Sequence, residues 1–337
     1  MTHRPPAPPR WRVPGSDRRS PSLRTVSTLA AVTTLVLSVV TVSTLPAQKT
    51  TPPVAHSSAP SARSVTPTGE QPGNAGAAGD TSVDDHETRQ HNDPAGPPRR
   101  VHKLADHPLL TGSGRGLRET ECELPQWQDD PSAAEEFFTA ARECLDAAWE
   151  PVLRRHHLPF NPPTLHFPTG ENFSTACGTI EIGTATAAYY CKGDLYVPYA
   201  GLQTDQYGKS PGIYLALFAH EYGHHVQELS GIMTTAWNHI YRVGQDSAKG
   251  MEMSRRKELQ AQCFSGMFMA SHVGGDGAIT QPMFSAAWAD QISRGDDDAE
   301  ARKHGSNAHY AEWWRTGART NALTECNTFS APKSAVS

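Results

Sequence analysis

The chain has 337 residues and a formal net charge of −5 at pH 7. This modest charge comes without a basic, aromatic patch in the part rich in apolar residues, so nucleic acid is not an expected partner. The length would fit about two domains if all of it folded, but the composition divides the chain sharply.

The first segment, residues 1–24, is a basic tail with six arginines, no lysine and a single acid, Asp17. Residues 25–46 carry no charge and are about long enough to cross a bilayer as a helix. A basic flank before an apolar run places the tail in the cytoplasm and the rest of the chain outside. We therefore expect a transmembrane anchor, or alternatively a cleaved signal sequence that would release a secreted protein.

Residues 47–115 are rich in Pro, Ser, Ala, Gly and Thr and hold few large apolar residues before Val101. Such a composition cannot bury enough apolar surface to offset the entropy lost on ordering. The sequence therefore predicts a disordered linker between the membrane and one folded domain over residues 116–331.

All six cysteines lie in this domain, beyond the expected export segment, so disulfides are expected. None forms a CxxC pair, which argues against a thiolate zinc site. The sequence alone does not fix the pairing, but proximity along the chain favours Cys122–Cys144, Cys177–Cys191 and Cys263–Cys326.

The first elements of the domain are one long helix and several short strands. Residues 131–157 have apolar side chains at helical spacing and acids near the start, which predict a helix. Residues 163–169 predict a strand, and residues 186–199 predict a hairpin that turns at Lys192-Gly193. The stretch Leu195 to Pro198 is a candidate edge for pairing with an extended peptide.

The later elements are helices. Residues 210–231 predict a helix with Ser210 as N-cap and Gly231 as C-terminal stop. A second long helix is expected over about residues 252–273, and at least one more between residues 283 and 314. Few strands and several helices indicate an α+β domain dominated by helix.

The middle of the helix over residues 210–231 carries a candidate metal site. His220 and His224 are four residues apart, so they share a helix face and can present two imidazole nitrogens to one ion. With Glu221 beside them they form an HExxH arrangement, in which a carboxylate can polarise a metal-bound water. His225 lies about 100° further round the helix, so we expect it to cap or pack. The alternative is that His220 and His224 are core histidines satisfied by hydrogen bonds.

A third ligand is needed, and catalytic zinc with two histidines commonly takes a carboxylate. Glu258 is the best candidate, because the apolar residues after it anchor its helix in the core. Glu228 shares the helix face of the histidines but lies too far along the axis. Glu252 is weaker and is more readily explained as a solvated acid at the start of a helix.

Four stretches between residues 177 and 329 carry a family resemblance: CGT with YYCKGDLYV, HEYGHHVQ, SRRKELQAQCFSG, and RGDDDAEARKHGSNAHYAEWWRTG followed by CNTF. In their order they resemble the bacterial neutral zinc metallopeptidases, which are zincin-like proteins tethered to the membrane or secreted. The resemblance implies one zinc ion on His220, His224 and Glu258, with Glu221 as catalytic base.

The chain departs from this family at Gln262, where members usually carry the aspartate of ELQADC. Four residues after Glu258 on the same helix, this side chain is placed to accept a hydrogen bond from a zinc-bound histidine. An amide oxygen can accept that bond without the charge of a carboxylate. We therefore expect metal binding to survive and activity to be reduced. His309 differs too, near a position where the family often has arginine or glutamine.

These observations predict a zinc peptidase acting on peptide or protein substrates outside the membrane. Glu221 would take a proton from the metal-bound water and pass it to the leaving amine. The oxyanion needs a further donor, for which His304 is the first choice and His309 the second. Two alternatives stay open: a catalytically weak or inactive zinc-containing scaffold module of the cell envelope, favoured by Gln262, and a hydrolase of amide bonds in cell-wall or other non-protein substrates.

Overall fold

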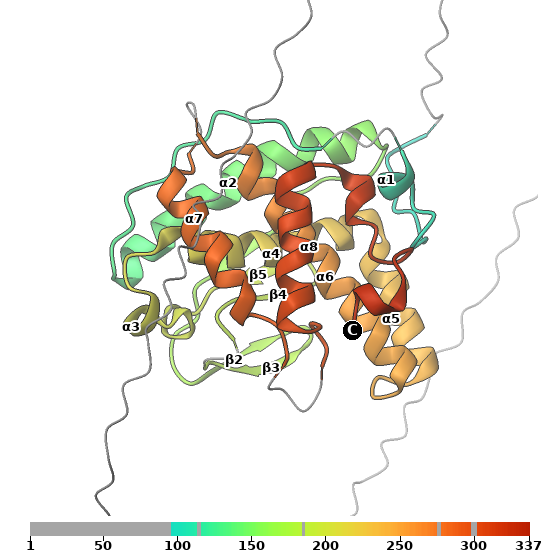
Figure 1. The fold of residues 1–337 in the computed structure, drawn as a ribbon. Coiled ribbons are helices and arrows are strands. Elements are labelled where there is room, and N and C mark those ends of the chain that lie inside the picture. Colours follow the sequence, from blue (N-terminus) through green and yellow to red (C-terminus); the bar gives the residue numbers. More distant parts are fainter. Residues whose placement is uncertain (1–95, 113–115, 184–185, 275–277, 298–301) are drawn as a thin grey trace, which may run out of the picture. The chain divides into compact units, whose positions relative to one another are not determined.

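The computed structural model describes residues 96–112, 116–183, 186–274, 278–297 and 302–337. The expected basic tail, the expected anchor over residues 25–46 and most of the expected linker lie outside these residues. No helix among the described residues is long and apolar enough to cross a membrane. Helices dominate and the strands form two small sheets (Figure 1), which confirms the α+β prediction.

The folded unit extends past the expected domain at both ends. Helix α1 (Pro108–Thr111) lies in the stretch predicted to be a linker, yet its Leu109 and Leu110 are buried. His107 fixes α1 by accepting from the Leu109 N–H at Nδ1 and donating to the Ser230 carbonyl at 3.2 Å. At the other end Val336 is fully buried. An average composition hides a few anchoring leucines, so it does not mark where the buried residues begin.

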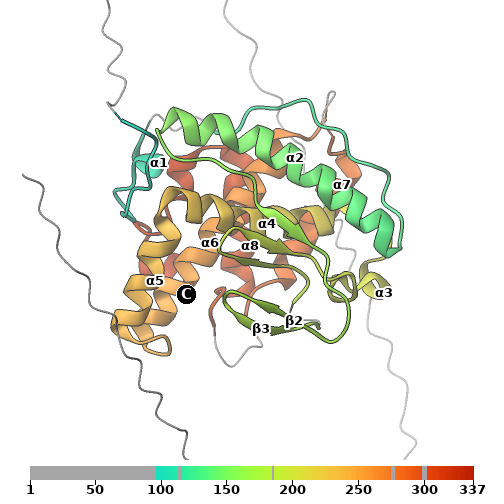
Figure 2. The same cartoon turned by 180° about the vertical axis from the view of Figure 1, so that it is seen from behind.

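The long helices stack in layers. Helix α2 (Pro131–Arg155) packs on α4 (Pro211–Ser230), α4 on α6 (Ala248–Ser271), and α6 on α8 (Asn307–Thr320). Accordingly, α8 faces the viewer in Figure 1 and α2 in Figure 2. Aromatic rings fill the first interface, where Phe138 and Phe218 have centroids 5.0 Å apart. The predicted helices over 131–157 and 210–231 are thereby confirmed.

Helices α4 and α6 cross closely at one glycine. A Cβ added to Gly223 would lie 2.9 Å from the carbonyl oxygen of Ala261, which is closer than real Cβ contacts. Only a residue without a side chain fits there. This contact brings the middle of α4, with its histidines, next to the middle of α6.

Several shorter helices were not foreseen. Gly231, at φ +94°, ends α4 as predicted, but α5 (Ile232–Val243) begins with the next residue. The stop signal therefore marks a corner between two helices. Helix α6 starts four residues before the expected position because Ser247 caps it. Helix α3 (Thr204–Tyr207) was not foreseen either, whereas α7 (Gln281–Asp290) confirms the expectation of at least one helix between residues 283 and 314.

The main sheet has three strands in the order β1 (Thr164–His166), β5 (Asp194–Tyr196) and β4 (Tyr189–Cys191). Strand β1 is parallel to β5, and β4 pairs with β5 as the predicted hairpin. Because β5 is central, the prediction that Leu195 to Pro198 offers a free edge was wrong. Among the described strands, β4 has no partner on its other side.

A second, unexpected hairpin joins β2 (Asn172–Thr175) and β3 (Gly178–Glu181). Its strands are too short and polar to give a clear sequence signal. Phe173 packs against Tyr196 of the main sheet, with ring centroids 5.0 Å apart. The hairpin therefore lies on the main sheet.

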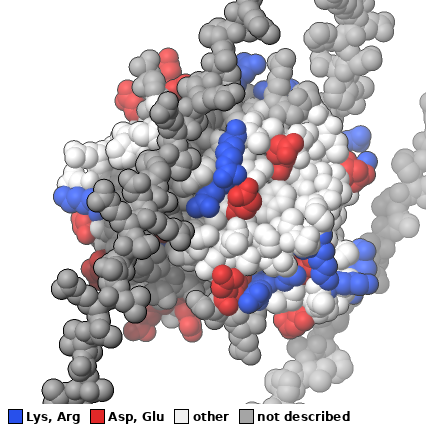
Figure 3. All heavy atoms as spheres, in the orientation of Figure 1, with Lys and Arg blue, Asp and Glu red and all other residues white. Residues whose placement is uncertain are grey.

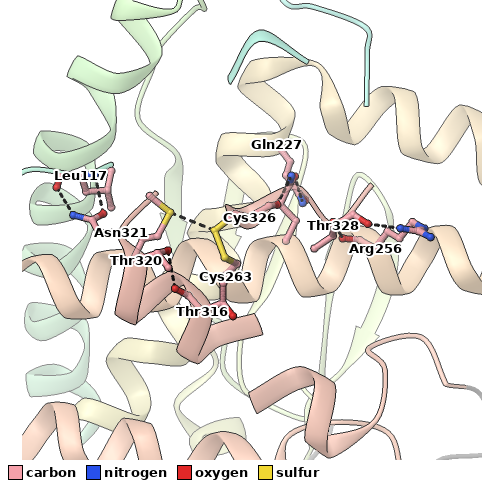
Figure 4. Close-up of a disulfide and its surroundings, with 11 residues drawn as sticks. Leu117, Gln227, Arg256, Cys263, Thr316, Thr320, Asn321, Cys326 and Thr328 are labelled. Atoms are coloured by element: carbon pink, nitrogen blue, oxygen red, sulfur yellow. Dashed lines mark hydrogen bonds between the residues drawn. A yellow bond between two sulfur atoms is a disulfide. The ribbon is translucent and has the colours of Figure 1, made fainter. Parts of the chain in front are cut away.

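The structure contains the three disulfides favoured by proximity in the chain: Cys122–Cys144, Cys177–Cys191 and Cys263–Cys326. The last one is fully buried and ties α6 to the 3-10 turn Leu323–Cys326 that follows α8 (Figure 4). The face of the molecule seen in Figure 3 carries charges of both signs, interspersed among uncharged residues.

Candidate metal centre

Helices α4 and α6 bring together the three ligand candidates named from the sequence. Nε2 of His224 lies 2.9 Å from Oε2 of Glu258, and Nε2 of His220 lies 3.3 Å from the same oxygen. One ligand atom from each residue lies within 4.8 Å of the others, and all three side chains are buried. Two turns of separate helices thus aim three metal-binding atoms at one point.

The opposite edge of each histidine ring meets a glutamine. Nδ1 of His220 donates to Oε1 of Gln262 at 2.9 Å, and Nδ1 of His224 donates to Oε1 of Gln227 at 2.9 Å. An amide oxygen only accepts, so each Nε2 keeps its lone pair for an ion. The predicted hydrogen bond from a candidate ligand histidine to Gln262 is present. Gln227 was missed, although its position one turn after His224 was a usable signal.

Buried hydrogen bonds fix which way these amides point. Nε2 of Gln262 donates to Oε1 of Gln291, whose own amide nitrogen donates to the Ala287 carbonyl at 2.9 Å. Because each amide nitrogen has an acceptor, each oxygen faces its histidine.

The second glutamine is held in the same way. Nε2 of Gln227 donates to the Lys257 carbonyl at 2.8 Å and to Oε1 of Gln260 at 3.0 Å. Gln260 in turn donates to the Cys326 carbonyl at 3.2 Å. Figure 4 shows Gln227 close to Cys326 and its disulfide. The orientation of His224 therefore depends on the segment that this disulfide holds.

Glu258 is a charged ligand in a buried place. Burial acts to raise its pKa, but the Lys257 ammonium holds that pKa well below the usual range. Nζ of Lys257 contacts Oε1, the carboxylate oxygen that does not face the histidines. The carboxylate is thus ionised and ready to bind a cation.

Glu221 is half-buried on α4, and among the described residues its carboxylate has no hydrogen-bond or ion-pair partner. Its neighbours include Tyr189 of β4. Burial raises the pKa of Tyr189, and the charges of Glu221 and Glu258 raise it further. Glu221 is therefore a carboxylate without a partner among the described residues, next in sequence to His220, and it acts electrostatically on the same tyrosine as Glu258.

His304 reaches the same centre from the loop before α8. Its Nε2 lies 4.0 Å from Oε2 of Glu258, and its Nδ1 donates to the carboxylate of Asp296 at 3.1 Å. Asp296 also accepts from the backbone N–H groups of Lys303 and His304 at 2.6 Å each. Partial burial acts to lower the pKa of His304, but Asp296 and Glu258 outweigh it and the pKa is raised.

Helix α8 contributes a residue that the sequence did not suggest. Tyr310 is buried, its ring centroid lies 6.0 Å from that of His220, and burial is the main reason that its pKa is raised. Its neighbour His309 points elsewhere, because its Nδ1 donates to the Ser337 carbonyl at 2.6 Å. Among the described residues, no contact links His309 to the three ligand candidates, so the geometry favours His304 as the donor.

The remaining candidates have other partners. Glu228 pairs with Arg100 at 3.1 Å, and Glu252 pairs with Arg256 at 2.8 Å. His225 packs as expected, between the Tyr190 hydroxyl and a backbone carbonyl, and burial lowers its pKa to about 4. None of these side chains belongs to the metal centre.

The donor set fits zinc. Two neutral imidazoles and one carboxylate are the protein ligands of many catalytic zinc sites, which leave one position open. Hydrogen bonds to the outer nitrogens of both rings are the usual support of such a site. The three candidate ligand atoms and the hydrogen bonds behind them are therefore compatible with a zinc ion.

Comparison with known proteins extends this picture. Residues 120–329 match the family described as "putative neutral zinc metallopeptidase". The uncharacterized protein YpfJ of Escherichia coli K12 is 32% identical over 239 residues, covering 66% of this chain and 79% of YpfJ. The uncharacterized protein Rv2575 of Mycobacterium tuberculosis H37Rv is 29% identical over 219 residues, covering 57% of this chain and 69% of Rv2575. No solved structure gives a significant match.

Proposed function

Because the chain belongs to the neutral zinc metallopeptidase family, we propose that it is a zinc-dependent peptidase that hydrolyses peptide bonds outside the cytoplasmic membrane. The observation that carries the proposal is the convergence of His220, His224 and Glu258, with the carboxylate of Glu221 next in sequence to His220 on the same helix. The family supports peptide substrates. The extracellular position rests on the basic residues 1–24 and the uncharged residues 25–46.

His220, His224 and Glu258 would hold one zinc ion, which when bound supplies a Lewis acid for the scissile carbonyl and an acidic water. Glu221 can take a proton on its carboxylate and deliver it to the leaving amine. His304, fixed through Nδ1 by Asp296, directs Nε2 towards the centre and can donate to the carbonyl oxygen as it gains charge.

The substrate would bind as an extended strand along β4. Among the described residues, β4 is paired on one side only, and its Tyr189 lies within electrostatic reach of Glu221 and Glu258. Main-chain hydrogen bonds to such an edge hold peptides irrespective of their side chains. This arrangement favours peptides over small amides as substrates.

A zinc-containing scaffold module with little or no activity is the second candidate. Gln262 favours it, because a neutral amide leaves His220 less basic than a carboxylate would. The free carboxylate of Glu221 argues against it, since a purely structural zinc site has no use for a base.

The test is metal content by mass spectrometry, followed by cleavage of a peptide library, for the parent protein, Glu258→Ala and Glu221→Gln. The parent and Glu221→Gln should each carry about one zinc per chain and Glu258→Ala little, while only the parent should cleave peptides. A folded parent without zinc would overturn the proposal. Zinc without cleavage would favour the scaffold module.

A further inference from the structure

The two oxygens of Glu258 have different partners. Oε2 faces Nε2 of both His220 and His224, whereas Oε1 contacts Nζ of Lys257. One oxygen is thus placed for the metal, and the other is held by an ammonium group. The carboxylate would thus be shared between the Lys257 ammonium and a bound metal ion.

Lys257 is itself fixed in place. Its side chain is only 8% exposed, and Nζ lies 5.2 Å from the ring centroid of Trp237 on α5. Its carbonyl accepts from Gln227, which orients His224. The residue therefore supports the centre from its backbone and from its side chain, and the ring of Trp237 stabilises the ammonium.

A buried lysine beside a divalent cation needs a physical reason. Its charge repels the incoming ion, and its burial costs solvation free energy. The Lys257 ammonium also balances the negative charge of Glu258, but a bound ion would balance that charge by itself. A carboxylate ligand, however, can bind an ion through one oxygen or through two, and the second oxygen would fill the position that a catalytic site keeps open.

We propose that Lys257 is a positioning residue that withholds Oε1 of Glu258 from the metal, so that the ligand binds through Oε2 alone. This inference rests on the proposed zinc site. It assigns to Lys257 the task of keeping one position of the ion open beside Glu221. The lysine takes no part in proton transfer.

The test is the visible spectrum of the cobalt-substituted protein, because d–d bands weaken as the coordination number of Co²⁺ rises. Lys257→Met keeps the apolar stem and removes the charge, and Lys257→Arg keeps the charge. Lys249→Met, an exposed lysine at the start of the same helix, is the matched control. The bands of Lys257→Met should fall to about half, while those of Lys257→Arg and Lys249→Met should equal those of the parent.

A Lys257→Met spectrum equal to that of the parent, from a protein with parental circular dichroism, would overturn the inference. Should this variant not fold, X-ray absorption of the zinc-loaded parent decides the matter. It should show a single carboxylate oxygen at bonding distance, and a second one would overturn the inference. A parent that takes up neither metal would overturn the proposed zinc site as well, whereas metal uptake without peptide cleavage would leave the role of Lys257 standing.

Discussion

His220 donates from Nδ1 to Oε1 of Gln262 at 2.9 Å, and Gln262 is buried and anchored in turn by Gln291. This pair sets the ring orientation and the tautomer that the metal site needs. We expect Gln262→Leu to weaken zinc binding by about 10-fold or more, because the ring loses its acceptor. Competition with a chelator measures this loss. Gln206→Leu, at an exposed position, should bind as the parent does, and an unchanged affinity in Gln262→Leu would contradict this role.

The closest approach of α4 and α6, at Gly223, should be needed for the metal site. Gly223→Ala would push its Cβ against the Ala261 carbonyl, so we expect a loss of stability of about 1–3 kcal/mol and weaker zinc binding. Urea unfolding and zinc titration measure the two effects. Gly183→Ala is the control, because its Cβ would meet nothing within 4 Å. Equal stability and equal zinc affinity of Gly223→Ala and Gly183→Ala would show that α4 and α6 can move apart without harm to the site.

His304 and His309 offer a matched test of the catalytic donor. His304→Ala should lower kcat by about 100-fold or more with zinc content unchanged, because a donor to the developing charge is lost. Asp296→Asn should give a smaller fall in kcat, since it removes only the charge that orients the ring. His309→Ala should keep parental kinetics, because that ring faces Ser337. Parental kinetics in His304→Ala would exclude this donor.

Acid should destabilise the fold below about pH 6.5, the usual pKa of an unfolded histidine. Burial is the main cause that lowers the folded-state pKa of His107, His225 and His272, to about 4 for His225. As the pH falls below 6.5 the unfolded chain binds protons first, so stability is lost towards pH 4, with about 3 kcal/mol from His225 alone.

The measurement is urea unfolding of the metal-free protein at several pH values between 7.5 and 4.5. His225→Gln should show a shallower loss of stability with falling pH than the parent. The exposed His102→Gln should follow the parent curve. Stability that is independent of pH between 6.5 and 4.5 would contradict the prediction.

The ligands could be predicted from the sequence because their signal is local. The spacing of His220 and His224 is a property of any helix, and the apolar residues around Glu258 mark it as buried. Of the residues that were missed, only Gln227 had a local signal. Tyr310, Lys257 and Asp296 reach the centre through the packing of α8, the side-chain rotamer of Lys257 and the path of the loop before α8. Such contacts depend on tertiary packing and on side-chain rotamers, so no motif or periodicity predicts them.

The elements show the same division. The caps and periodicity of α4 gave its limits to within a residue, whereas α5 was missed because Gly231 served as a stop for one helix and as the N-cap of the next. Likewise, the strand β5, expected at an edge, lies at the centre of its sheet. Strand order depends on β1, whose residues precede their β5 partners by 30 positions (Thr164 pairs with Asp194). Local patterns predict the elements, and tertiary packing decides their neighbours.

The Cys263–Cys326 disulfide and the zinc ligand His224 lie at the two ends of one hydrogen-bonded chain through Gln260 and Gln227. Thermodynamic linkage makes such a coupling reciprocal. The free energy by which the disulfide changes the metal affinity equals the free energy by which bound metal changes the stability of the disulfide. If the disulfide raises the metal affinity of the site by holding Gln260 and Gln227 in place, bound metal would favour formation of the disulfide by the same free energy.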